Sequence, residues 1–303
     1  MNRLSTEKRR AVIASLVEGN SIRATVRMTG VAKATVTKLL LDMGTVCSIE
    51  QDRLMRDLNC ERVQCDEIWA FVYAKQKNIP DSKKGEDGVG DVWTYVAIDP
   101  DTKLVPSFLI GSRDLNTATA FMQDVAKRLA HRVQLTTDGN HPYLNAVRGA
   151  FSGEVDYAQL IKYYGNDPSK APERRYSPGV CTGTERRPMI GNPDSQHVST
   201  SHIERQNLTM RMSMRRFTRL TNGFSKKAEN LTAAVSLHFA YYNLCRVHGS
   251  LNKQTPAMAA GVTDHVWTLD ELIGLLEAAE AVPVKRGSYA KTRNVRREAE
   301  NSN

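Results

Sequence analysis

Residues 62–73 read RVQCDEIWAFVY, and this stretch decides the class of fold. It is rich in β-branched and aromatic residues and short for a helix, which predicts a β-strand. An acidic residue, Asp66, lies near the middle of this strand. Because side chains alternate across a strand, Asp66 and Glu67 should point to opposite faces, and we expect only one of them to join a cluster on one face.

The chain after this strand predicts an α/β domain. Helical and strand patterns follow one another, and a helical pattern returns at Thr200. The order is three strands, helix, strand, helix, strand and helix, which predicts a mixed five-stranded sheet flanked by helices. The expected elements after the first strand are strands at 92–98 and 104–110, a helix at 116–130, a strand at 132–137, a helix at 142–151, a strand at 155–161 and a helix at 227–247.

The N-terminal region predicts an all-α helix-turn-helix domain. Three short helices are expected within residues 5–43, with Gly30 in the turn before a last helix at 32–43. In such a pattern the last helix enters the major groove of DNA. Its exposed positions would be Lys33, Thr35, Thr37 and Lys38, of which the first two suit base edges and Lys38 a phosphate. The alternative is a small three-helix bundle that does not contact DNA.

The domain organisation follows from shifts in pattern and composition. We expect a helix-turn-helix domain at 1–45, a linker at 46–60 that is helical around 50–58, a catalytic domain at 61–262, and an amphipathic helix with a basic tail at 263–303. Residues 164–200 show no periodicity and many Pro, Gly and basic residues, which predicts a long basic loop inserted in the catalytic domain.

Composition indicates an acidic partner. The 303 residues carry a formal net charge of +9 and the pI is near 9.3, which fits a nucleic acid better than a membrane. No long apolar run or signal peptide is expected, so we predict a cytoplasmic, nucleoid-associated protein without a membrane partner. The five scattered cysteines predict free thiols. Further cations near the N-terminus would face phosphates: Arg3, Lys8, Arg9, Arg10, Arg23 and Arg27.

Three acids are best placed to meet. Asp66 lies on the first strand, Asp138 ends the fourth, and Glu204 opens a later helix. If the first and fourth strands are neighbours, the two aspartates lie side by side with that helix packed across them. Clustered carboxylates need cations, and hard oxygen ligands favour Mg²⁺ or Mn²⁺. Two such ions promote in-line displacement at a phosphodiester. Each acid taken alone also suits a turn, a helix start or an ion pair.

The helix after Glu204 is basic. Residues 205–227 contain seven cations and no Asp or Glu. Glu204 and Arg211 are seven residues apart, about two helical turns, so both leave the same face. The cations Arg205, Arg211 and Arg215 would therefore form a track for a DNA strand beside the acids.

Several short motifs together resemble bacterial insertion-sequence transposases of the DDE type. The resemblance covers about residues 1–262 and implies a ribonuclease-H-like core in which Asp66, Asp138 and Glu204 bind two Mg²⁺ or Mn²⁺ ions. It also implies terminal inverted repeats and target DNA as double-stranded partners, and a homo-oligomer on DNA. The 66 residues between Asp138 and Glu204 exceed the spacing in retroviral-type integrases, which the insertion at 164–200 would explain. The motifs are CDEIW at 65–69, TDG at 137–139, HIERQN at 202–207, YNLCRVHGSL at 242–251 and TPA at 255–257.

Two other functions remain open at this point. One is a DNA-binding regulator whose nuclease-like domain is catalytically inert. The other is a metal-dependent endonuclease that lacks specificity for element ends.

Overall fold

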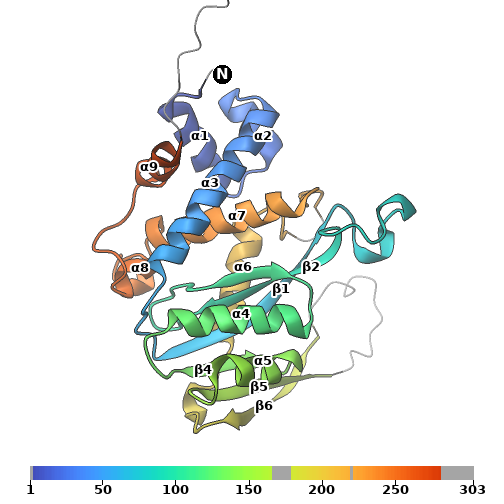
Figure 1. The fold of residues 1–303 in the computed structure, drawn as a ribbon, viewed down its shortest axis with the longest axis vertical. Coiled ribbons are helices and arrows are strands. Elements are labelled where there is room, and N and C mark those ends of the chain that lie inside the picture. The colour runs from blue at the N-terminus through green and yellow to red at the C-terminus, as the bar shows by residue number, and fades with distance from the viewer. Residues whose placement is uncertain (1–2, 166–178, 219–220, 281–303) are drawn as a thin grey trace, which may run out of the picture.

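A six-stranded mixed sheet forms the centre of the computed structural model, which describes residues 3–165, 179–218 and 221–280 (Figure 1). The strand order is β3-β2-β1-β4-β5-β6. β1 is antiparallel to β2 and parallel to β4, and β4 is parallel to β5. This topology confirms the predicted ribonuclease-H-like α/β fold. The strands are β1 (Arg62–Val72), β2 (Gly90–Ile98), β3 (Phe108–Gly111), β4 (Gln134–Asp138), β5 (Asp156–Tyr164) and β6 (Cys181–Ile190).

Helices cover both faces of the sheet. On one face α4 and α5 bury Phe121 and Tyr143 against Tyr95 of β2, and on the other α6 and α7 bury Ile203 and Phe239 over β1 and β2. The helices are α1 (Thr6–Val17), α2 (Ile22–Thr29), α3 (Lys33–Leu54), α4 (Leu115–Arg128), α5 (Pro142–Phe151), α6 (Ser201–Ser213), α7 (Ala228–Ala240), α8 (Pro256–Ala259) and α9 (Leu269–Ala279). Shorter helical turns are η1 (Gln76–Asn78), η2 (Asp81–Lys83), η4 (Ser195–His197), the π-helical η5 (Tyr241–Cys245) and η6 (Gly249–Leu251). In the part of the chain that the structure describes, no helix combines the length and the apolar character needed to cross a bilayer.

The sixth strand corrects the prediction of five strands and a long loop at 164–200. β6 pairs antiparallel with β5 from Tyr157 opposite Ile190 to Tyr164 opposite Cys181. Most of its side chains are exposed or half-buried, so the sequence has no alternation of apolar and polar residues to mark it as a strand. The predicted loop cations Lys170, Arg174 and Arg175 lie outside the described residues, as do those of the C-terminal tail from residue 281 onward.

The third helix is much longer than predicted. It was expected to end at Met43 but continues to Leu54, so most of the expected linker is helical. This extension lets α3 run from the N-terminal helices to α7 of the sheet domain (Figure 1). Gly44 lies at the crossing, where a Cβ atom would stand only 2.4 Å from the Cα of Ala233. A single continuous helix, α3, therefore connects the N-terminal helices to the helices that cover the sheet.

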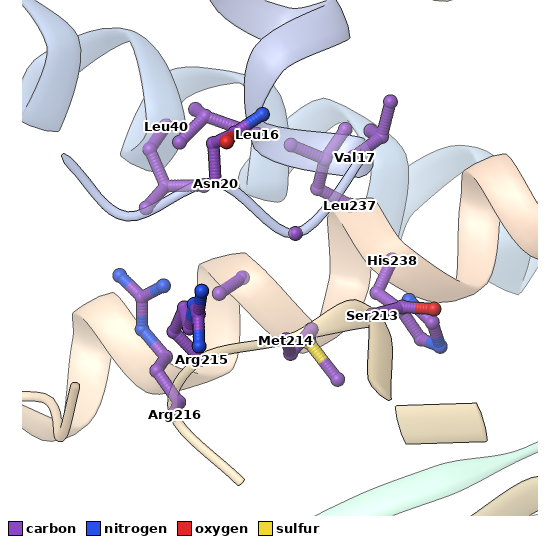
Figure 2. Close-up of a pocket in the computed structure, with 12 residues that line it drawn as sticks. Leu16, Val17, Asn20, Leu40, Ser213, Met214, Arg215, Arg216, Leu237 and His238 are labelled. Carbon is purple, nitrogen blue, oxygen red and sulfur yellow. The ribbon is translucent and has the colours of Figure 1, made fainter. Parts of the chain in front are cut away.

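A second contact joins the N-terminal helices to the end of α6. Figure 2 shows Leu16, Val17 and Asn20 above a small cavity and Ser213, Met214, Arg215 and Arg216 below it. Between them Gly19 has a φ of +80°, and a Cβ atom there would meet the backbone oxygen of Ser213 at 2.9 Å. The turn after α1 thus lies directly on the backbone that ends α6.

The C-terminal helix neutralises cations that we expected to face phosphates. Arg9 is buried and donates to both carboxylate oxygens of Glu280, at 3.0 and 2.9 Å. Arg10 pairs with Asp270 and Arg3 with Glu280. The prediction is wrong for Arg9, which α9 buries in an ion pair across 271 residues of sequence. Arg3 and Arg10 remain partly exposed beside their acidic partners, and their contact with phosphates stays a prediction.

Substitution of Gly44 tests the helix crossing. Gly44→Ala should lower the free energy of unfolding by about 1–3 kcal/mol, because the new methyl group overlaps Ala233. Gly149→Ala is the matched control: this helical glycine of α5 has nothing within 4 Å of its Cβ position, and alanine should stabilise it by about 1 kcal/mol. Urea denaturation of both variants measures the difference, and an equal response of the two would contradict the close crossing.

Candidate metal centre

Asp66 and Asp138 lie side by side at the centre of the sheet. β1 and β4 are parallel, with Cys65 opposite Thr137, so the next residue of each strand is an aspartate. β4 ends at Asp138, whereas β1 continues to Val72. Beyond the paired aspartates β1 stays paired with β2 but has no described strand on the side of β4, so this edge of β1 is open. This is the placement that the sequence predicted for these two residues.

Glu67 is a third member of the cluster. One carboxylate oxygen from each of Asp66, Glu67 and Asp138 lies within 4.8 Å of the others. Our expectation that only one of the two neighbouring acids could join the cluster is wrong. Glu67 does leave β1 on the side of α5, but its longer side chain reaches the turn after β4, where Asn140 donates to it at 3.0 Å.

The contacts of Glu67 hold its carboxylate in place. Its side chain is only 2% exposed, Arg113 donates through Nε at 2.6 Å, and the Tyr143 hydroxyl donates at 2.9 Å. Asp138 accepts from the backbone N–H of Asn140 at 3.0 Å. One guanidinium thus faces three carboxylates, which leaves an excess of negative charge.

Burial and mutual repulsion perturb the two aspartates. Burial, followed by the charge of Asp138, raises the pKa of Asp66 to about 7. The pKa of Asp138 is also raised, first by burial and then by the charge of Glu67. The folded protein therefore favours a proton on Asp66, or a cation in its place.

Helix α6 is fastened across this cluster by two side chains. Gln64, two residues before Asp66 on the same face of β1, accepts the N–H groups of His202 and Ile203 through Oε1, at 3.0 and 3.2 Å. Asn207 donates from Nδ2 to Asp66 Oδ2 at 2.9 Å. The first contact satisfies orphan donors at the start of the helix, and the second orients Asp66.

Glu204 lies on α6 but outside the group of three. Its side chain is 46% exposed, pairs with Lys162 of β5 and accepts from the Thr200 hydroxyl. It is three residues before Asn207, nearly one helical turn, and its charge contributes to the raised pKa of Asp66. The structure thus brings Asp66 and Asp138 together and holds Glu204 nearby in an ion pair with Lys162.

The residues predicted to bind DNA occupy two regions. Lys33, Thr35 and Lys38 are exposed and Thr37 is half-buried on the first turns of α3, and Lys38 pairs with Asp42. Arg205 and Arg215 are exposed along and after α6. Arg211 lines a pocket with Trp69 and Phe71 of β1, which places it on the side of α6 that faces the open strand edge.

The donor set fits a hard divalent cation. Three carboxylates converge, and Asn207 adds a buried Oδ1 that has no hydrogen-bond partner among the described residues. Such oxygen ligands are those that Mg²⁺ and Mn²⁺ accept, usually with several waters retained. Asp66, Asp138 and Glu67 would hold an ion from the sheet, and Glu204 would approach it from α6 after release from Lys162.

Sequence reasoning missed three residues of the site. Asn207 was part of the motif at 202–207 and lies one turn after Glu204, so helical spacing could have revealed it. Glu67 was set aside on strand alternation alone. Arg113, just before α4, carries no local signal, because its role depends on the sheet bringing it to Glu67.

Comparisons with known proteins do not identify the chain. No family model and no curated protein matches the sequence. Among solved structures, the Mos1 transposase paired-end complex with left transposon end aligns over 52% of this chain and 59% of that chain, at 11% identity and a TM-score of 0.22. The Mos1 strand transfer complex aligns over 79% and 78%, at 11% identity and a TM-score of 0.24. In the first of these the match spans less than two thirds of the Mos1 chain, and TM-scores this low support no conclusion about this protein.

Removal of the acceptor at Gln64 tests how α6 is fastened. Gln64→Met leaves one buried and one partly buried N–H group without an acceptor and should lower the free energy of unfolding by about 1–3 kcal/mol. Gln206→Met is the matched control, because this buried glutamine of α6 has an amide nitrogen without a hydrogen-bond partner among the described residues, and its replacement should cost clearly less. Chemical denaturation of both variants provides the measurement, and a Gln64→Met variant as stable as the parent would show that Gln64 does not anchor the helix.

The raised pKa of Asp66 predicts a pH-dependent stability. An aspartate whose pKa is higher in the folded state binds more protons when folded, so the metal-free protein should lose stability as the pH rises from about 4 to about 7. The loss should be on the order of 4 kcal/mol, and Asp66→Asn should abolish most of it.

The same titration predicts how metal binding responds to pH. Mg²⁺ or Mn²⁺ needs the ionised carboxylate, so its stabilisation of the parent protein should grow between about pH 6 and pH 8. Thermal unfolding with and without the ion measures this, with Asp66→Asn as the variant that should respond weakly. A metal effect that is independent of pH and of Asp66 would count against the site.

Proposed function

We propose that this protein is a DDE-type DNA transposase that binds the ends of its own insertion sequence and catalyses metal-dependent strand cleavage and strand transfer. The observation that carries the proposal is the pairing of Asp66 and Asp138 at the end of β4, with α6 and Glu204 fastened across them. The sequence motifs at these positions support the same function.

Asp66, Asp138 and Glu204 are the proposed catalytic and metal-binding residues, with Mg²⁺ or Mn²⁺ as the cofactor and two ions in the complete site. Bound ions would lower the pKa of the attacking hydroxyl and neutralise charge on the phosphate. Glu67 contributes a further carboxylate, and Arg113 balances part of the charge when the site is empty of cations. Asn207 keeps Asp66 oriented through its amide.

The reaction that this site supports is phosphodiester displacement in two steps. Water attacks first at the element end and releases a 3′-hydroxyl group. That hydroxyl then attacks a phosphodiester of the target DNA, and one strand end leaves as the new bond forms. Neither step requires a covalent link to the protein, and the partly exposed Glu204 lies where a polymeric substrate could reach it.

Double-stranded DNA is the proposed partner, recognised by two sets of residues. Lys33, Thr35, Thr37 and Lys38 would contact element ends through the start of α3. Arg205, Arg211 and Arg215 would follow the phosphates near the cluster. The proposed division into a helix-turn-helix domain at 1–45 and a catalytic domain at 61–262 matches these roles, and a homo-oligomer would hold the two ends together.

Cleavage and joining of labelled DNA ends tests the function. Duplexes that carry the inverted repeats flanking the coding region should be nicked and joined to a target plasmid in Mg²⁺. Asp66→Asn, Asp138→Asn and Glu204→Gln should each reduce the rate by about 1,000-fold or more, since each removes several kcal/mol of transition-state stabilisation. Asp81→Asn, at a side chain that is 92% exposed, is the control and should retain full activity.

The same assay separates the two other functions. Binding to the repeats without any metal-dependent cleavage indicates the inert regulator. Cleavage of any duplex at equal rates indicates the endonuclease without end specificity. Lys33→Ala should weaken binding to the repeats while the nicking of unrelated DNA is unchanged.

A further inference from the structure

A pocket of about 480 Å³ lies along the open edge of β1 beyond the carboxylate cluster. β4 ends at Asp138, so no described strand covers this edge until Ser225 meets it at Val72 and Tyr73. Trp69, which lines the pocket, is three residues after Asp66, which corresponds to about 10 Å along a strand. Arg211 lines it from α6, seven residues after Glu204. The pocket therefore lies farther along β1 than the acids, with Trp69 on the face of β1 that also carries Glu67.

Aromatic rings form the floor of this pocket. Trp69 and Phe71 stand 5.7 Å apart between ring centroids, and Phe224 supports Phe71 at 4.9 Å. Trp69 is 36% exposed, so part of its ring is open to a ligand. Phe217, which is buried, closes the inner end. An accessible aromatic surface of this kind suits a planar, apolar group.

Cations surround the aromatic floor. Lys75 lies over the ring of Trp69, 5.6 Å from its centroid. Arg216 is half-buried, donates to Ser225 Oγ at 2.8 Å and is paired with no carboxylate among the described residues. Burial lowers the pKa of Arg216 to about 10, so it still carries its charge at neutral pH. None of the described residues that line the pocket is acidic, so the pocket suits an anionic chain.

We propose that this pocket receives an unpaired nucleobase of the DNA strand held at the carboxylates. Base stacking on Trp69 and Phe71, with a neighbouring phosphate on Arg211 and Arg216, combines the two features that single-stranded DNA sites share. The distance of about 10 Å corresponds to about three stacked nucleotides. The inference rests on the proposed function, since it places the base on the same strand that the acids cleave.

Binding of short oligonucleotides without metal tests the pocket apart from catalysis. The probes are a twelve-nucleotide oligothymidylate and a chain of the same length and charge in which every base is absent. In EDTA the full-length protein should bind the base-bearing probe about 10-fold more tightly, because stacking adds to a shared phosphate contribution. Trp69→Leu should remove this preference and leave affinity for the abasic probe unchanged. Trp267→Phe, near α9, is the matched control and should keep the preference.

Tryptophan fluorescence gives a second readout on the same samples. The base-bearing probe should quench emission in the parent and in Trp267→Phe but much less in Trp69→Leu. If Trp69→Leu does not fold, Phe71→Leu replaces it with the same expectation. Equal affinity of the parent protein for both probes would overturn the proposal, as would an equal loss for both probes in Trp69→Leu. A protein that distinguishes the probes but never cleaves DNA would support the pocket and contradict the transposase function. A protein that cleaves and joins DNA but binds both probes equally would support the transposase function and contradict the pocket.

Discussion

The carboxylate cluster depends on one contact, in which Gln64 accepts hydrogen bonds from the start of α6. A single amide oxygen on β1 accepts two N–H groups of the helix, at 3.0 and 3.2 Å. Thr200 is at the N-cap position, but its hydroxyl donates to the Glu204 carboxylate and accepts no backbone N–H of the helix. With the first turn held by β1, Asn207 reaches Asp66 and Arg211 reaches the open edge of the strand. Gln64, which aligns the helix, therefore lies two residues before Asp66 on the same face of β1.

The carboxylate cluster destabilises the metal-free protein through burial and mutual repulsion. Asp66, Glu67 and Asp138 each place a carboxylate oxygen within 4.8 Å of the others, and burial raises the pKa of Asp66 to about 7. Arg113 and Lys162 each neutralise one member from outside, the first on Glu67 and the second on Glu204. Asp66 and Asp138 form no salt bridge among the described residues, and the Arg113 charge offsets only part of the raised pKa of Asp138. A bound divalent cation would supply the positive charge that balances these carboxylates.

One helix and one strand carry the connections between regions. α3 runs from the N-terminal helices to α7, where Gly44 allows close contact with Ala233. Gly19 brings the turn after α1 onto Ser213 at the end of α6. The N-terminal helices thus meet α7 and the end of α6 through close backbone contacts. β1 in turn carries both the acids and the aromatic floor of the pocket.

From the sequence alone, strand and helix periodicity and the order of elements predicted the sheet, and with it the juxtaposition of Asp66 and Asp138. These are local properties, because the pattern of apolar residues reflects which face of each element is buried. The tertiary structure decided which charges meet. Glu67 joins the cluster because β4 ends beside it, Lys162 holds Glu204 across 42 residues, and Arg9 pairs with Glu280 across 271. Pairings at such separations leave no periodic trace, since they arise only when packing brings distant segments together.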